Sequence, residues 1–211
     1  MNETLKRALS GAVYVAVMWI GASYETSFRL LFIILGLACI YEMRKLRKGK
    51  KKNIAFLYVL IPFFLIQLLG IPDSNSAFDP SYILLMFVLT WTFDTFAYLV
   101  GVKFGKHKIM PTISPKKSWE GFGGGFIFTI ISAYLTASYL IPEIDLKQAI
   151  VISLFVPFTA TIGDFVESYY KRKAGVKDSG NFIPGHGGIL DRMDAFMFTI
   201  PALYIYLSLI K

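Results

Sequence analysis

Apolar residues occur in long runs along this chain, separated by short polar segments, and do not alternate with polar residues. An α-helix rises about 1.5 Å per residue, so about 20 apolar residues cross the roughly 30 Å hydrocarbon core of a bilayer. The runs cover residues 9–24, 28–43, 54–70, 81–101, 121–141, 148–168 and 193–210. They predict an all-α polytopic membrane bundle with about seven transmembrane helices, in which the shorter runs need thinning of the bilayer, tilt or flanking aromatic residues.

The composition agrees with this pattern, since 55% of the 211 residues are hydrophobic and 19 are Phe. We expect a single integral-membrane domain over residues 1–211, with spans that carry no recognised motif in 1–80 and the catalytic part in 81–211. Lys6 and Arg7 precede the first run, but no small-residue cleavage site clearly follows it. We therefore interpret this run as a span and not as a removed signal peptide.

Basic residues are distributed unevenly between alternate loops. Nineteen of the 22 Lys and Arg fall before span one or in the regions that join spans two to three, four to five, and six to seven. The other loops and the C-terminus hold Arg29, Lys147 and Lys211. Because short cytoplasmic loops carry the excess of basic residues, the N-terminus is predicted to be cytoplasmic and the C-terminus external.

The net charge of +8 comes from basic residues that concentrate in alternate loops. This distribution indicates membrane topology and argues against nucleic-acid binding. Cys39 is the single cysteine, which excludes an intramolecular disulfide. With two His in the whole chain, a Cys/His metal site is also excluded.

A dense cluster of charges interrupts the apolar pattern in residues 163–194. If 148–172 is one helix, Asp164, Glu167, Ser168 and Lys171 share a face, because they are spaced by three, four and seven residues. Such a stripe is suited to hold a cation and a phosphate together. For Glu167 and Lys171 an ordinary ion pair at a solvated helix end is an equal alternative, whereas an acid as deep as Asp164 favours function.

Two further carboxylates, Asp191 and Asp194, lie three residues apart at the start of the last span. They would complement a helix dipole there, and Asp191 with Arg192 could act as a cap. Together with Asp164 they also supply the hard oxygen ligands that Mg²⁺ prefers. Asp94, inside span four, is a further intramembrane acid and is functional by default.

Glycines and lysines mark two loops at the predicted cytoplasmic face. The bend at 184–188 contains Gly185, His186, Gly187 and Gly188, whose backbone N–H groups could approach a phosphate, although a tight re-entry turn is the plainer alternative. Lys116 and Lys117 follow Ser-Pro in the second loop and form a plausible anion clamp. Trp119 fits an aromatic belt, and Gly121 and Gly125 fit close helix packing better than phosphate binding.

These residues also carry a family resemblance. The chain resembles the phosphatidate cytidylyltransferase (CDP-diacylglycerol synthase) family over residues 94–194. The first matching pattern runs from Asp94 through Gly101 and Phe104-Gly105-Lys106 to Ser114-Pro115-Lys116-Lys117-Ser118-Trp119-Glu120-Gly121. The second is Ser168-x-x-Lys171-Arg172-x4-Lys177-Asp178-x-Gly180-x-x-Ile183-Pro184-Gly185-His186-Gly187-Gly188-x-x-Asp191-Arg192-x-Asp194.

The resemblance implies that CTP and phosphatidic acid react at the cytoplasmic side of a bacterial plasma (inner) membrane, giving CDP-diacylglycerol and pyrophosphate. The implied metal is Mg²⁺, held by Asp164, Asp191 and Asp194, with Asp94 as a further candidate and a second cation as an option. The implied catalytic residues are Asp164, Ser168, Lys171, Arg172 and Asp191. The implied substrate-binding residues are Lys116, Lys117, Lys177, Asp178, Gly185, His186, Gly187, Gly188 and Arg192.

Two other functions remain open from the sequence, and a homodimer is retained as a candidate assembly. A related membrane enzyme could use CTP with an isoprenoid lipid acceptor, which the labelled lipid product would distinguish. An ion-coupled transporter is the alternative from another class, since polar residues within spans can mark an ion path. The charges gather at one face and no inverted repeat is visible, which favours the enzyme.

Overall fold

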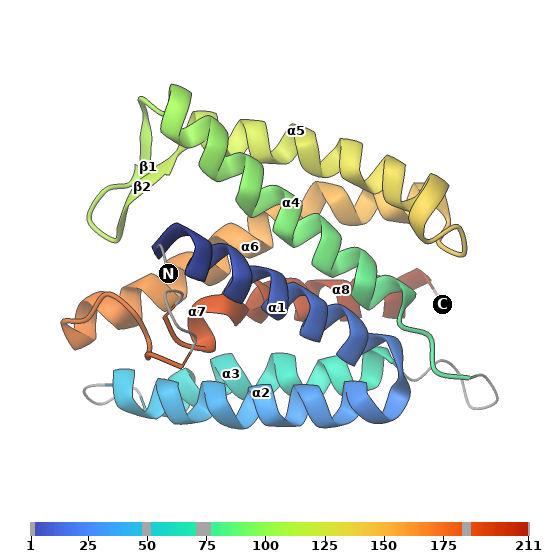
Figure 1. Cartoon of the computed structure of the whole chain (residues 1–211), viewed down its shortest axis with the longest axis horizontal. Coiled ribbons are helices and arrows are strands. Elements are labelled where there is room, and N and C mark those ends of the chain that lie inside the picture. The colour runs from blue at the N-terminus through green and yellow to red at the C-terminus, as the bar shows by residue number, and fades with distance from the viewer. Residues whose placement is uncertain (1–2, 48–51, 71–76, 183–186, 211) are drawn as a thin grey trace.

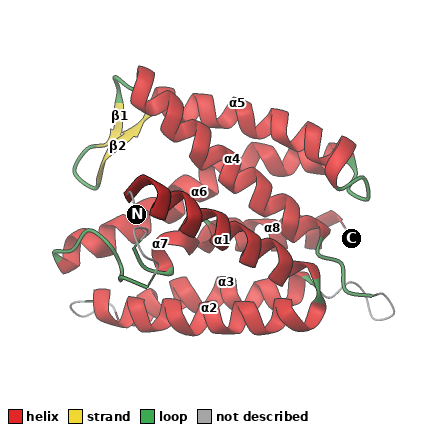
Figure 2. Ribbon diagram, in the orientation of Figure 1, coloured by secondary structure: helices red, strands yellow, loops and turns green. Residues whose placement is uncertain are grey.

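The computed structural model describes residues 3–47, 52–70, 77–182 and 187–210, and it is a bundle of long helices (Figure 1 and Figure 2). The all-α class is confirmed. The helices are α1 (Glu3–Ser23), α2 (Glu25–Leu46), α3 (Lys52–Leu69), α4 (Ser81–Phe104), α5 (Trp119–Leu135), α6 (Leu146–Ala174), α7 (Leu190–Met193) and α8 (Phe196–Ile210). A π-helical turn over Thr136–Leu140 extends α5.

Five of the seven apolar runs that the sequence predicts as spans fall on one helix each; the run 121–141 continues from α5 into the π-helical turn, and the run 193–210 begins at the end of α7 and continues along α8. Within the described residues, five helical segments are long and apolar enough to cross a membrane: Glu25–Leu46, Ser81–Phe104, Trp119–Leu140, Leu146–Ala174 and Leu190–Ile210. Leu9–Ser23 and Asn53–Leu69 are apolar but shorter. The chain is therefore a polytopic membrane protein, and the count of seven spans stays a prediction.

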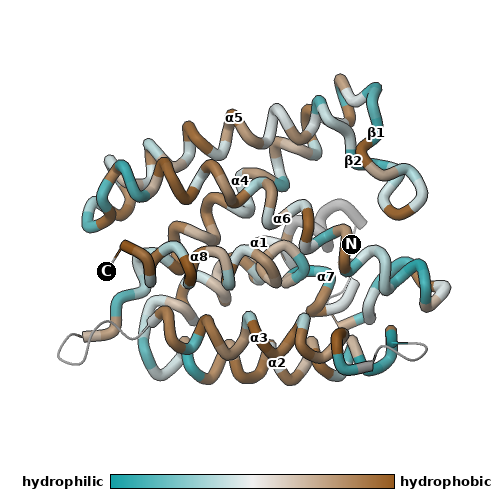
Figure 3. Tube along the Cα trace, turned by 180° about the vertical axis from the view of Figure 1, so that it is seen from behind, coloured by the Kyte–Doolittle hydropathy of each residue, from teal (hydrophilic) through white to brown (hydrophobic). Residues whose placement is uncertain are grey.

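Sequence-distant basic segments meet at one end of the bundle. Figure 1 places the start of α1, the end of α2, the start of α3 and the end of α6 at one end, and the C-terminal end of α8 at the other. In Figure 3 hydrophilic stretches concentrate toward the ends of the molecule, while the middle of the helices is mainly hydrophobic. The segments that are rich in Lys and Arg therefore lie at one end of the bundle, and the end of the chain that is poor in them lies at the other.

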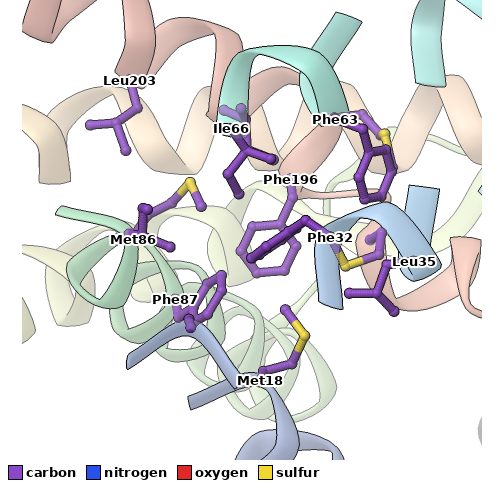
Figure 4. Close-up of a cluster of buried hydrophobic side chains, with 14 of the residues drawn as sticks. Met18, Phe32, Leu35, Phe63, Ile66, Met86, Phe87, Phe196 and Leu203 are labelled. Atoms are coloured by element: carbon purple, nitrogen blue, oxygen red, sulfur yellow. The ribbon is translucent and has the colours of Figure 1, made fainter. Parts of the chain in front are cut away.

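Phenylalanine side chains from α2, α4 and α8 meet in the core, together with methionine, leucine and isoleucine side chains (Figure 4). The Phe87 ring lies 6.3 Å from Phe32 and 5.5 Å from Phe196, measured between ring centroids, and stacks at 5.4 Å on Trp91. All three phenylalanines are essentially inaccessible to solvent. Many large apolar side chains instead point outward, for example Leu37, which is 63% exposed, and this surface is suited to lipid tails.

A two-stranded hairpin, absent from the sequence-based prediction, joins α4 to α5. Strand β1 (Lys108–Met110) pairs antiparallel with β2 (Ser114–Ser118). The Glu120 carboxylate closes its base by accepting hydrogen bonds from the backbone N–H of Lys106 (3.1 Å) and His107 (3.2 Å). The hairpin is therefore fastened to the first turn of α5.

Glycines set the spacing between α4 and α5, as the sequence predicts for Gly121 and Gly125. A Cβ atom at Gly121 would lie 2.6 Å from the Ala97 carbonyl oxygen and 3.0 Å from the Gly101 Cα. A Cβ at Gly125 would lie 2.7 Å from the Phe93 ring. Since neither backbone nor buried ring can yield, these positions accept no side chain.

We predict that Gly121→Ala destabilises the protein by about 1–3 kcal/mol, because the added methyl group pushes α5 away from α4. Gly123→Ala is the matched control, since a Cβ at Gly123 meets nothing within 4 Å and Ala favours a helix. Thermal unfolding of both variants in the same detergent measures the difference. Equal midpoints for the two variants would contradict the close approach of the helices.

Candidate active site

One face of α6 carries the polar residues of the site, as the helical spacing predicts. The side chains of Asp164, Glu167 and Lys171 are 14%, 0% and 11% exposed. Ser168 is half-buried one residue after Glu167. Glu167 and Lys171 form the expected ion pair, but Glu167 is fully buried, so the alternative of a solvated helix end is wrong for this pair.

Lys171 joins α6 to α7. Its ammonium group donates to Asp191 Oδ1 at 2.6 Å as well as pairing with Glu167. Asp191 Oδ2 in turn accepts hydrogen bonds from the backbone N–H of Ser179 (2.8 Å) and of Gly188 (2.7 Å). Asp191 therefore organises the chain before α7. The N-cap residue of α7 is Ile189 and makes no side-chain cap hydrogen bond, so Asp191 does not occupy the cap position considered from the sequence.

Gly163 brings Asp194 next to α6. A Cβ atom at Gly163 would collide with the Asp194 carbonyl oxygen, so the connection between α7 and α8 lies directly on α6 at this point. The Asp194 carboxylate accepts a hydrogen bond from the Ala195 N–H at 2.9 Å. It also interacts electrostatically with Lys117, Lys171 and Asp191.

Lys117, at the end of the hairpin, forms an ion pair with Asp164 on α6. Its burial lowers the pKa of the Lys117 ammonium group below the usual value, while the Asp94 and Asp194 carboxylates act in the opposite direction. A cation at this position therefore depends on its acidic neighbours. No spacing rule connects residues 117 and 164, so the sequence alone did not predict this pair.

A cavity of about 570 Å³ lies between the hairpin, α4 and α6, and it has the size of a small-molecule site. Its polar lining residues are Asp94, Tyr98, Lys108, Ser114, Lys116, Lys117, Ser118, Thr161 and Asp164. The predicted lysine pair thus faces the same space as two of the predicted acids. Lys108 joins them, although the sequence analysis counted it only as a topological charge.

Asp94 lies between two cavities. It lines the large one and also a smaller cavity of about 290 Å³, to which Tyr14, Trp91 and Arg192 contribute. The Tyr14 hydroxyl donates to the Arg192 carbonyl oxygen at 3.1 Å, which ties α1 to α7. Arg192 therefore lines the smaller cavity, whereas Lys108, Lys116 and Lys117 line the larger one.

Arg172 connects the end of α6 to the hairpin. Its guanidinium group donates to the Ile113 carbonyl at 3.4 Å and to the Val176 carbonyl at 3.1 Å. Lys177 and Asp178 follow as exposed residues, outside the polar cluster of α6 and α7. Gly185 and His186 lie outside the described residues.

The second span contributes a residue that the sequence analysis missed. Glu42 on α2 is 5% exposed and accepts a hydrogen bond from Ser179 Oγ at 2.7 Å. Its position inside an apolar span was an available signal, by the same reasoning that identified Asp94. The motif-free region 1–80 is therefore in direct contact with the chain that leads into α7.

The acids of this region fit a hard divalent cation in chemistry, since each offers carboxylate oxygens. Within the described residues, however, no group of three His, Cys, Asp or Glu side chains is placed to hold a metal ion by itself. Asp164 and Asp191 each pair with a lysine. A divalent cation at these carboxylates would therefore need further oxygen ligands from substrate phosphates or water, as Mg²⁺ commonly has.

Comparison with known proteins gives consistent matches. The sequence profile of the Cytidylyltransferase family matches residues 7–210. The chain is 47% identical to the phosphatidate cytidylyltransferase of Staphylococcus saprophyticus over 126 residues, covering 60% of this chain and 48% of the relative. It is 43% identical to that of Thermotoga maritima over 167 residues, covering 75% and 59%. The chain spans about half the length of the curated relatives it matches.

Proposed function

The chain belongs to the cytidylyltransferase family, and on this premise we propose that it transfers the CMP moiety of CTP to phosphatidic acid. The products are CDP-diacylglycerol and pyrophosphate. In this reaction an oxygen of the lipid phosphate forms a bond to the α-phosphorus of CTP while the bond from that phosphorus to the β-phosphate oxygen breaks. Both substrates are anionic at the reacting groups, so the protein must position them and offset their charge.

The observation that carries the proposal is the convergence of Lys117 and Lys171 with Asp164, Asp191 and Asp194 at one end of the bundle. Lysine ammonium groups bind phosphate as point charges. Here they are held by carboxylates from different helices, so their positions are fixed before substrate binds. A charged group this close to apolar spans is costly, which favours a functional role over a packing role.

The large cavity is our candidate for the nucleotide. Lys108, Lys116 and Lys117 give its wall positive charge, and Ser114 and Ser118 offer hydroxyl groups. Ser168, Lys171 and Arg172 are proposed to contact the phosphate groups of the substrates. Lys177, Asp178, Gly187, Gly188 and Arg192 remain candidates for substrate contacts at the edge of the site, together with Gly185 and His186.

Mg²⁺ is the proposed cofactor, with Asp164, Asp191, Asp194 and Asp94 as candidate ligands and a second cation as an option. When bound, it would polarise phosphoryl oxygens and offset the charge that develops on the leaving pyrophosphate. Lys117 and Lys171 hold Asp164 and Asp191 in place as carboxylates. A general base is not required, since a phosphate monoester is largely ionised near neutral pH.

An isoprenoid lipid phosphate, the alternative acceptor considered from the sequence, is not favoured, since the relatives are named phosphatidate cytidylyltransferases. The test is pyrophosphate release from CTP by the purified protein, with phosphatidic acid and a polyprenyl phosphate supplied separately, each with Mg²⁺ and with a chelator. We expect metal-dependent release with phosphatidic acid. Release with the polyprenyl phosphate alone would replace the proposed acceptor, and no release with either would remove the proposed activity.

In this assay we predict that Lys171→Ala lowers kcat/KM by about 100-fold, because a fixed positive charge at the reacting phosphates is lost. Lys171→Arg should recover part of the activity, since a planar guanidinium does not reproduce a compact ammonium group. Lys173→Ala is the matched control, because Lys173 lies on the same helix but is exposed over the Tyr169 ring. Unchanged kcat/KM values for both substrates in folded Lys171→Ala would show that this lysine only supports topology.

We further propose that the basic end of the bundle faces the cytoplasm of a bacterial cell and that the inner membrane is its location. Reporter fusions after residues 50, 145 and 211 are predicted to report the inside, the outside and the outside, respectively, because Lys and Arg in short loops set orientation. A fusion after residue 50 on the same side as that after residue 211 would contradict both the topology and a cytoplasmic site. A homodimer remains a candidate assembly.

A further inference from the structure

Glu42 is a buried acid in a membrane-spanning helix. It lies near the end of α2, among the buried side chains of Cys39, Met43 and Leu46, and is itself 5% exposed. A carboxylate in such surroundings is unfavourable unless its oxygens are hydrogen-bonded. A hydrophobic residue would satisfy packing at this position without that cost. Packing in the core therefore does not explain why a glutamate occupies position 42.

The partners of Glu42 all come from the chain that leads into α7. Oε1 accepts from the Ile189 N–H at 3.0 Å, and Oε2 accepts from the Leu190 N–H at 2.8 Å and from Ser179 Oγ at 2.7 Å. All three contacts are buried and join residues more than 130 positions apart in the sequence. One side chain on α2 thus fixes two separate segments of the loop.

The same two segments are held from the other side by Asp191. Its Oδ2 accepts from the backbone N–H groups of Ser179 and Gly188, and Ser179 Oγ lies 3.0 Å from it. The Ser179 hydroxyl has a single proton, so it serves either Glu42 or Asp191 at a given moment. Glu42 and Asp191 are therefore coupled through one hydroxyl and one short stretch of backbone.

The position of Glu42 explains why residues 180 and 188 are glycines. A Cβ atom at Gly180 would lie 2.6 Å from Glu42 Oε1, and a Cβ at Gly188 would collide with Glu42 Oε2 and with Ser179 Oγ. The loop therefore approaches α2 as closely as a backbone without side chains permits. At these two positions glycine provides room for a carboxylate of the protein itself.

We propose that Glu42 is a positioning residue that fixes residues 179–180 and 187–190 and thereby sets the place of Asp191 and of its partner Lys171. The proposal rests on the proposed function. Glu42 contacts no reacting group in this arrangement and acts through the loop. The N-terminal helices thus contribute to the site although they carry none of the motif.

Hydrogen–deuterium exchange of the purified protein in lipid nanodiscs tests the structural part independently of activity. In Glu42→Gln the amide N–H₂ offers donors where an acceptor is required, so peptides that contain Ile189 and Leu190 should exchange about tenfold faster or more. Glu42→Asp should give a smaller increase. Glu25→Gln is the matched control on the same helix, since Glu25 is exposed and pairs with Arg29, and it should leave these peptides unchanged.

Kinetics then separate positioning from mere support of the fold. We expect Glu42→Gln to lower kcat or raise the Mg²⁺ concentration for half-maximal activity by about 10- to 100-fold, with a smaller change in KM for CTP. Glu42→Asp should recover part of this loss. Ser179→Ala, which removes one loop partner and little volume, should shift the Mg²⁺ dependence in the same direction even if the Glu42 variants fold poorly.

Each result decides the proposal. Unchanged exchange of the 187–190 peptide in a folded Glu42 variant, or in Ser179→Ala if no Glu42 variant folds, would overturn it. Faster exchange with wild-type kcat and Mg²⁺ dependence would also overturn it, because Glu42 would then support the loop without affecting the site. Wild-type protein that releases no pyrophosphate refutes the proposed function instead, and the exchange measurement still decides whether Glu42 holds the loop.

Discussion

Carboxylates inside an apolar bundle require partners, and this requirement organises one end of the molecule. Glu42, Glu167 and Asp191 are buried or nearly so, and Asp164 is 14% exposed. Asp164, Glu42 and Asp191 are paired with groups from other parts of the chain, either a lysine or backbone N–H groups near the start of α7, while Glu167 pairs with Lys171 on its own helix. Because the penalty for an unpaired buried charge is several kcal/mol, these contacts constrain how α2, α6, α7 and the hairpin can sit together.

In the proposed reaction the same contacts would prepare the site for anionic substrates. Lys117 and Lys171 are paired with Asp164 and Asp191 in this structure, and in the proposed reaction they face phosphate groups. A substrate that brings both phosphate and a divalent cation offers each member of a pair a new partner of opposite charge. Substrate binding would then exchange ion pairs and leave no charge without a partner, which keeps the electrostatic cost of binding low.

Local patterns predicted much of this arrangement. The helical repeat placed Asp164, Glu167 and Lys171 on one face of α6, and the apolar runs located the helices. What the sequence did not predict depends on contacts between distant segments. Lys117 reaches Asp164 only because the hairpin folds over α4, and Glu42 meets Ser179 only because α2 packs beside the loop before α7. Neither contact follows from a repeat or a spacing. Glu42 alone carried a local signal, as an acid in an apolar run.

The central claim is that the Lys117 ammonium group leaves its ion pair with Asp164 and pairs with the triphosphate of CTP when the nucleotide binds. Equilibrium binding of CTP to the purified protein, with Mg²⁺ and without lipid acceptor, tests it most directly. We predict that Lys117→Ala weakens binding by about tenfold or more, since a charge-assisted contact to phosphate is lost. Lys103→Ala, at an exposed lysine on α4 outside the cavity lining, should bind as the wild type does. Equal affinity of Lys117→Ala and wild type would contradict the account.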